Sequence, residues 1–142
     1  MNTIVVILGV IIIVLIYILV KYVMATSTQL TAKANLNDDI SAVSITNGPT
    51  NTSYSYGLWI YVNSWDMSKT KTIFNRNDNI KLYLDQNSPV LKCDLLMSDN
   101  TTKTVEITDN FPLQKWVHII VSVANQYVDC YIDGKLVRSG RA

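Results

Sequence analysis

The side chains that could carry out acid–base or nucleophilic chemistry are few in this sequence. His118 is the single His and Glu106 the single Glu among 142 residues. Retaining glycoside hydrolysis uses two carboxyl groups about 5–5.5 Å apart, and the stretch Thr104–Thr108 around Glu106 holds no second carboxylate. One His also leaves no nucleophile–base pair that the spacing can assemble. We therefore predict that the protein is not an enzyme and has no catalytic residues.

Thiol chemistry and ligand binding by aromatic rings are the next candidates. Cys93 and Cys130 are the only cysteines, and their spacing forms no metal-ligand pattern. We predict two free thiols, and a disulfide between them is the alternative if the domain is extracellular. Tyr54, Trp65 and Tyr127 could supply a ligand or interface platform, the alternative being rings that only pack at the rim. With 12 Lys and Arg against 11 Asp and Glu and no basic cluster, we expect no nucleic-acid partner.

The elements that must position these residues are clearest between residues 111 and 137. Apolar and polar side chains alternate over Val117–Val123 and over Tyr127–Ile132, which is the period of a half-buried strand. Asp133-Gly134 separates the second run from Lys135–Val137. This dipeptide is typical of a type I′ hairpin turn, because both central residues of that turn need positive φ.

Shorter runs of the same kind predict strands at 54–62, 70–74, 80–84, 90–97 and 102–108. Ile40, Val43 and Ile45 predict an earlier strand, with a turn at Asn47-Gly48-Pro49 after it. Strands about ten residues apart with polar turns are typical of an all-β sandwich. The predicted core is apolar and consists of Trp59, Phe74, Leu82, Leu84, Leu95, Ile107, Trp116, Val117, Ile119, Val121, Val128 and Ile132.

Three short motifs carry a family resemblance. Trp116-x-His118 opens one predicted strand, the next ends in Tyr-Ile-Asp-Gly, and an upstream strand centres on Leu58-Trp59-Ile60. In this order the motifs resemble the laminin-G-like, concanavalin A-like jelly roll. The signature residues are Trp59, Trp116, His118, Tyr131, Asp133 and Gly134. The resemblance implies a jelly-roll sandwich and a structural role for His118, and it specifies no ligand.

The same resemblance raises two further expectations. Some laminin-G-like domains hold calcium at the rim through Asp side chains and backbone carbonyls. The loop candidates for this role are Asp78, Asp85, Asp94, Asp99 and Asp109, although ordinary turn chemistry is the stronger expectation and we predict no cofactor. Such jelly rolls usually continue beyond the Asp-Gly hairpin, so we expect an abbreviated sandwich completed by a neighbour, or a further C-terminal part. Open sheet edges invite pairing with another chain.

The N-terminal stretch is unusually apolar. Ile4–Val20 carries no charge, and the apolar character resumes after Lys21 as far as Met24. As a helix this stretch spans about 30 Å, the thickness of a bilayer's hydrocarbon core. We predict a membrane anchor that includes Ile4, Val10, Val14, Ile18, Val20 and, at the head groups, Lys21. The alternatives are a signal peptide cleaved near Val23-Met24-Ala25, disfavoured because no Lys or Arg precedes Lys21, and a buried soluble helix.

The chain is thus predicted to have three parts: the anchor at 1–25, a polar stalk at 26–51 and the β-sandwich domain at 52–142. Lys21 and Lys33 follow the span, which favours a cytosolic domain by the positive-inside rule. Glycosylation triplets begin at Asn51 and Asn100. They matter only if the domain reaches the secretory lumen.

An N-terminal anchor followed by one short jelly roll resembles small membrane-anchored minor capsid proteins of large icosahedral DNA viruses. This resemblance implies a non-enzymatic structural protein in the virion's inner membrane that faces the capsid. Its partners would be the lipid bilayer and other capsid or membrane proteins, reached in part by sheet-edge pairing. The alternative is a lectin-like adhesion module on a cell surface or viral envelope, with a glycan or glycoprotein as its ligand.

Overall fold

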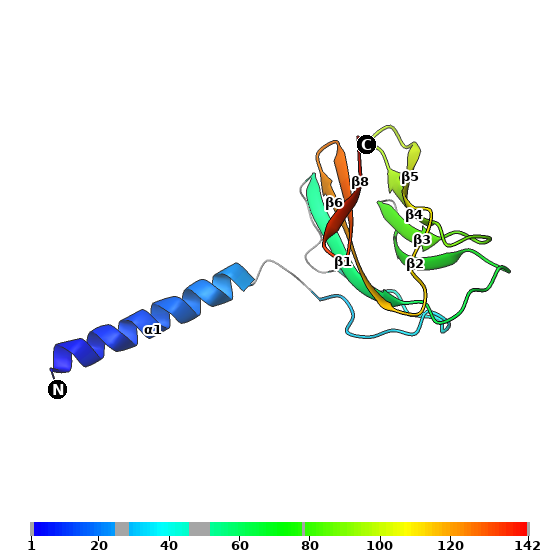
Figure 1. Ribbon diagram of the computed structural model, residues 1–142. Helices are drawn as coiled ribbons and strands as arrows, with labels where there is room; N and C mark the ends of the chain where they lie inside the picture. The colour runs from blue at the N-terminus through cyan, green and yellow to red at the C-terminus, as the bar shows by residue number, and fades with distance from the viewer. Residues whose placement is uncertain (1, 25–28, 46–51, 78, 142) are drawn as a thin grey trace. The chain divides into compact units, whose positions relative to one another are not determined.

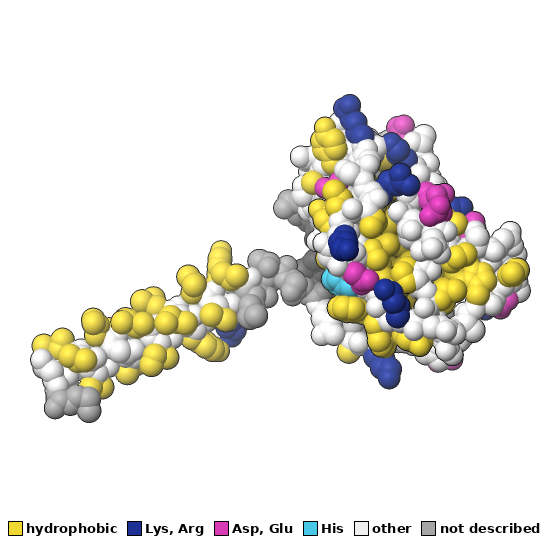
Figure 2. All heavy atoms as spheres, viewed as in Figure 1, with side chains coloured by type: hydrophobic (Ala, Val, Ile, Leu, Met, Phe, Trp, Pro, Cys, Tyr) yellow, Lys and Arg dark blue, Asp and Glu magenta, His cyan; other side chains and the backbone are white. Residues whose placement is uncertain are grey.

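The computed structural model describes residues 2–24, 29–45, 52–77 and 79–141, and the chain forms two compact units, 1–46 and 47–142 (Figure 1). In the first unit, α1 (Thr3–Met24) presents hydrophobic side chains along its length (Figure 2). Thr3–Val23 is long and apolar enough to cross a membrane, and both a membrane anchor and a signal sequence fit such a helix near the N-terminus. Lys21 lies in the last turn, where a cation interacts favourably with the helix dipole.

The described residues 29–45 of this unit contain no helix or strand. The strand predicted from Ile40, Val43 and Ile45 is therefore wrong. Their spacing of three and then two residues does not keep the side chains on one face of a strand, and Ile40 and Val43 are exposed. The turn predicted at 47–49 lies outside the described residues.

The second unit is a sandwich of two antiparallel sheets, which confirms the predicted fold class. Sheet A has the order β1-β6-β7-β8 and sheet B the order β2-β3-β4-β5. The strands are β1 (Ser53–Tyr61), β2 (Lys71–Arg76), β3 (Ile80–Leu84), β4 (Leu91–Leu96), β5 (Thr102–Thr108), β6 (Trp116–Ala124), β7 (Tyr127–Ile132) and β8 (Lys135–Arg141). After β1 the chain builds the whole of sheet B and then returns, so that β6 pairs with β1 (Figure 1).

The core lies between the sheets, where alternate residues of each strand point inward. In β4, for example, Leu91, Cys93 and Leu95 are buried. Two of the predicted core residues, Phe74 and Ile132, are partly buried and pack against the core. Eight more are buried: Leu82, Leu84, Leu95, Ile107, Val117, Ile119, Val121 and Val128. Phe111, from the loop between β5 and β6, is 1% exposed and was not predicted.

Trp59 and Trp116 were predicted in the core, and this prediction is wrong. Trp59 is 63% exposed and Trp116 is 61% exposed. Their neighbours Ile60 and Val117 are buried, and successive side chains of a strand point to opposite faces. The alternation that places Val117 inside therefore places Trp116 outside.

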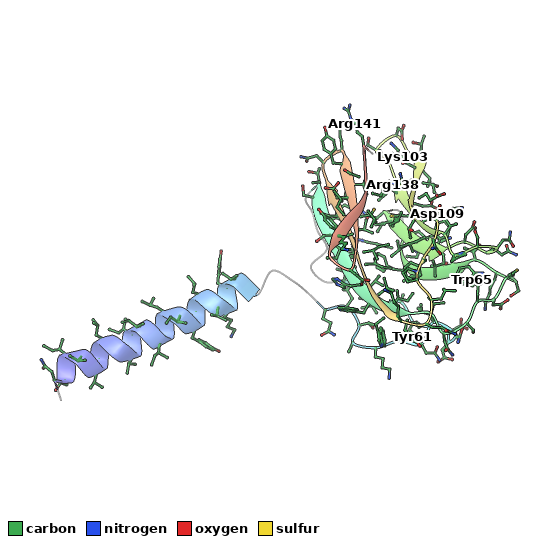
Figure 3. The ribbon with its side chains drawn as sticks, viewed as in Figure 1. Tyr61, Trp65, Lys103, Asp109, Arg138 and Arg141 are labelled. Atoms are coloured by element: carbon green, nitrogen blue, oxygen red, sulfur yellow. The ribbon has the colours of Figure 1, made fainter. Side chains whose placement is uncertain are left out.

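At the edges β5 and β8 the two sheets are joined by polar contacts. Arg138 Nε donates to the Glu106 carbonyl oxygen at 2.8 Å, and Lys103 Nζ donates to the Arg141 carbonyl oxygen. Figure 3 shows Lys103, Arg138 and Arg141 together along this side of the sandwich. On the side of β1 and β2, Arg76 Nη1 donates to the Tyr56 hydroxyl at 2.6 Å.

Candidate binding surface

Four aromatic side chains form a row on the outer face of sheet A, which we call the aromatic strip: Trp59 and Tyr61 of β1, and Trp116 and His118 of β6. Trp59 lies opposite His118, with ring centroids 4.7 Å apart. Tyr61 lies opposite Trp116, with centroids 5.6 Å apart. Cross-strand aromatic pairs of this kind stabilise a sheet.

The strip ends at the Trp59–His118 pair on the side toward the start of β1. The next outward residue of β1 is Gly57, opposite Ile120 of β6. A Cβ atom at Gly57 would lie 3.7 Å from Ile120 Cγ1 and 3.8 Å from His118 Nε2, so the glycine adds no side chain beside these two groups. The strip therefore presents the exposed rings of Trp59, Tyr61 and Trp116, together with the half-buried ring of His118.

A charged pair lies beside the strip. Lys115, next to Trp116 in the chain, has its Nζ 3.9 Å from Asp133 Oδ2, and both side chains are partly exposed. Such an exposed ion pair adds little stability. The Lys115 ammonium group is therefore accessible to a ligand or partner that covers the rings, whereas Asp133 Oδ1 also accepts the His118 backbone N–H.

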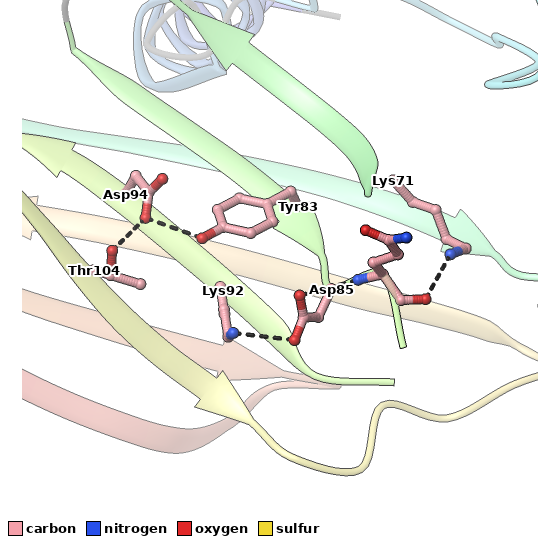
Figure 4. A network of polar contacts seen from close by, with 7 residues as sticks. Lys71, Tyr83, Asp85, Lys92, Asp94 and Thr104 are labelled. Carbon is pink, nitrogen blue, oxygen red and sulfur yellow. Dashed lines mark hydrogen bonds and ion pairs between the residues drawn. The ribbon is translucent and has the colours of Figure 1, made fainter. Parts of the chain in front are cut away.

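The outer face of sheet B has a different character. Asp94 accepts hydrogen bonds from the Tyr83 hydroxyl at 3.2 Å and the Thr104 hydroxyl at 2.7 Å, and Lys92 pairs with Asp85 at 3.1 Å (Figure 4). Partial burial, followed by the Asp94 carboxylate, raises the pKa of Tyr83. These polar side chains satisfy one another within the sheet, and the exposed aromatic rings are concentrated on sheet A.

A known family model agrees with this architecture. Residues 35–142 match the Laminin_G_3 family model, described as the concanavalin A-like lectin/glucanases superfamily. The chain belongs to this superfamily. No curated protein matches the chain. A solved structure from Bacteroides ovatus ATCC 8483, described as a "putative carbohydrate binding protein", is similar at 12% identity and a TM-score of 0.49. The match covers 63% of this chain and 26% of that protein.

The concanavalin A-like domain does not bring the three predicted platform residues together. Tyr54 is half-buried on the inner side of β1, where desolvation raises its pKa. Trp65 is half-buried in the loop after β1 and packs against the core. Tyr127 is 60% exposed at the start of β7. Tyr61 was not predicted as a site residue and Trp59 was predicted in the core, although their alternation with the buried Ile60 indicates that both point outward.

The Asp residues proposed for calcium are also separate from one another. The pKa of Asp85 is lowered by the Gln86 backbone N–H and then by Lys92, and that of Asp99 by hydrogen bonds from Thr101. Asp94 lies within β4, not in a loop as predicted, and Asp109 is exposed. Asp78 lies outside the described residues. Within the part of the chain that the structure describes, no three His, Cys, Asp or Glu side chains gather as a metal site.

The two cysteines face the interior of the superfamily domain from opposite sheets. Cys93 of β4 and Cys130 of β7 are buried and free. Burial raises the pKa of Cys93 to about 12 and that of Cys130 to about 11. Because the thiolate is the reactive form, these side chains are inert core residues at neutral pH.

Proposed function

We propose that the protein is a non-enzymatic, membrane-anchored structural protein that docks on a neighbouring protein through the aromatic strip. The observation that carries this proposal is the contrast between the two outer faces of the sandwich. Trp59 and Trp116 are more than 60% exposed on sheet A, whereas on sheet B the polar side chains bond one another. Trp and Tyr are enriched in binding hot spots, because a large rigid ring buries much area at small entropic cost.

The anchor part of the proposal rests on the length of the apolar helix. Thr3–Val23 provides 21 residues, and the segment is apolar enough to cross a membrane. The apolar core of a signal peptide runs for about 7–15 residues, whereas a membrane span needs about 20. Retention in the bilayer therefore accounts for the whole helix.

The specific setting we propose is a virion whose inner membrane holds α1, with the sandwich facing the capsid shell as a minor capsid protein. Lys21 and Lys33 follow the span, and this bias supports a domain on the cytosolic side. The architecture of one anchor and one short jelly roll supports a link between the membrane and a protein layer. Capsid or membrane proteins would then cover the aromatic strip or pair with a sheet edge.

A lectin-like adhesion module is the second candidate, and the Lys115–Asp133 pair beside the rings favours it. Ligand sites combine aromatic surface with a few polar groups that fix orientation. A sugar could stack on Trp59 or Trp116 while its hydroxyls reach these two charged side chains. This candidate places the domain outside the cell or on a viral envelope.

Photo-crosslinking in the full membrane-inserted chain tests the docking surface. A photoreactive residue at Tyr61 is expected to form an adduct with a defined neighbouring protein. Trp116→Ser should lower the yield about tenfold, the loss expected for about 1.4 kcal/mol at a hot spot. Tyr127→Ser is the matched control, because Tyr127 is equally exposed but pairs with Ala124 at the far end of β6. An unchanged yield in Trp116→Ser contradicts the proposal.

Sidedness distinguishes the two candidates. Asn100 lies in the exposed turn between β4 and β5, within reach of a glycosylating enzyme if the domain is lumenal. A domain that is accessible to protease and unglycosylated on intact internal membranes agrees with the capsid-facing protein. A protected domain glycosylated at Asn100, with glycan binding lost in Trp59→Ser, agrees with the lectin-like module instead.

A further inference from the structure

Lys71 occupies an unusual position at the rim of the sandwich. It is the first residue of β2 and lies opposite Leu84, which is 2% exposed, so its side chain starts on the inner side of sheet B. Lys71 is half-buried. A partly desolvated ammonium group is stabilised by acceptors that replace some of its water.

Main-chain carbonyl oxygens from two loops supply these acceptors. Lys71 Nζ donates to the carbonyl oxygens of Asp66, of Lys69 at 3.0 Å and of Gln86 at 3.5 Å. The same nitrogen lies 4.1 Å from the centroid of the Trp65 ring. An ammonium group has three donors, and three carbonyls match them, with the ring face as a fourth contact. Figure 4 shows Lys71 reaching across toward the segment that follows Asp85.

We infer that Lys71 is the resident cation of this rim and that the domain orders these loops without a metal ion. Carbonyl oxygens are ligands that calcium also uses, but calcium needs about six to eight oxygens. Here the three carbonyls already hold an ammonium group.

The neighbouring carboxylates accept hydrogen bonds from other groups. Asp66 Oδ1 accepts from the Ser68 backbone N–H at 2.8 Å. Asp85 accepts from the Gln86 backbone N–H at 3.0 Å and from Lys92 at 3.1 Å. A calcium ion would have to displace the Lys71 ammonium group from its three carbonyl oxygens, so the residues present favour the ammonium group over the metal.

The consequence for the fold is that one side chain joins the loop after β1 to the loop after β3. Gln86 Nε2 adds a second link by donating to the Ser68 carbonyl at 3.3 Å. Trp65, which packs against the core, is held between that core and the Lys71 ammonium. Loss of the charge should loosen Trp65 and both loops.

Thermal unfolding of the full chain in lipid nanodiscs tests this inference. The unfolding midpoint of the wild type is expected to be the same in a chelator and in about 5 mM calcium, which exceeds the 10⁻⁴–10⁻³ M affinities of extracellular calcium modules. A saturable rise of that midpoint with calcium overturns the inference. This measurement needs no variant.

Lys71→Met keeps the apolar stem and removes the charge. Its midpoint should fall by about 4 °C or more, and hydrogen exchange should quicken at residues 66–70 and 85–88 while β6 stays protected. Lys69→Met is the matched control, because Lys69 contributes only its carbonyl oxygen to Lys71 and keeps it after substitution. Equal midpoints and equal exchange in the two variants overturn the inference.

Discussion

Asp133 and His118 exchange two hydrogen bonds in sheet A. The Asp133 backbone N–H donates to the His118 carbonyl at 2.9 Å, and the His118 backbone N–H donates to Asp133 Oδ1 at 2.9 Å. Both bonds use main-chain atoms of His118, which leaves its imidazole to stack on Trp59 outside. The Trp-x-His and Asp-Gly motifs are therefore joined by hydrogen bonds to the main chain of His118. For this reason the motifs indicate a fold and do not specify a ligand.

The turn that makes this contact requires glycine at one position. Asp133 has φ 50° and Gly134 has φ 80°, which confirms the predicted left-handed hairpin turn. Gly134→Ala should lower the free energy of unfolding by about 1–2 kcal/mol, because a Cβ is strained in this region. Urea unfolding measures the change. Gly140→Ala in β8 is the control, since nothing lies within 4 Å of a Cβ there and φ is not left-handed; an equal loss in both variants contradicts the argument.

Because the Trp side chains of the aromatic strip are exposed, we expect that they can be substituted without unfolding the domain. Trp116→Ser should change the free energy of unfolding by less than about 1 kcal/mol, the span of strand propensities. Leu84→Ala, at a residue 2% exposed, should cost about 2–5 kcal/mol because it leaves a cavity. Denaturant titration of both variants measures this. If Trp116→Ser lowered the free energy of unfolding as much as Leu84→Ala does, Trp116 would have to be a core residue.

The sequence predicted the parts of the fold that depend on local pattern. Strand alternation located β3 and β5 at their observed bounds, and Asp133-Gly134 located the last hairpin. Hydrophobicity without regard to alternation gave a wrong core prediction for Trp59. The Lys71 site was not predictable from pattern, because its oxygens belong to the backbone of two loops that only the folded sheet brings together.

A hydrogen bond between the sheets should contribute measurably to stability. Arg76 donates to the Tyr56 hydroxyl at 2.6 Å, and the Tyr56 ring lies 4.7 Å from that of Phe74. Tyr56→Phe keeps the ring contact and removes the acceptor, so the free energy of unfolding should fall by about 1.5–3 kcal/mol, the contribution of a bond to a charged group. Tyr61→Phe, on the solvent-facing strip, should have no such effect. Equal values for the two variants would show that the Arg76 bond adds nothing.

The membrane proposal makes a prediction at the middle of α1. Val14→Arg adds about 2.5–3.5 kcal/mol to the free energy of insertion at the centre of a span. The variant should appear in the supernatant after carbonate extraction, whereas Val14→Leu should stay with the membranes. Retention of Val14→Arg in the membrane fraction is incompatible with an inserted anchor.

The buried thiols give the domain a specific response to alkaline pH. Burial, followed for Cys93 by the nearby Cys130 and for Cys130 by Asp129, raises their pKa values from 9.0 to about 12 and about 11. Above pH 9 the unfolded chain therefore loses protons that the folded domain keeps. Their contribution to stability is complete below pH 9 and is lost as the pH rises toward 11 and 12.

A comparison with a variant that lacks both thiols isolates this effect from Tyr and Lys titration. The free energy of unfolding of the wild type should fall more steeply between pH 9 and pH 11 than that of the Cys93→Ala, Cys130→Ala double variant. At pH 8 the wild-type thiols should react with iodoacetamide only as fast as the domain unfolds, because the native thiolate is scarce. Rapid labelling of the native protein, or parallel pH curves, would show that the thiols are accessible and that the core does not hold them neutral.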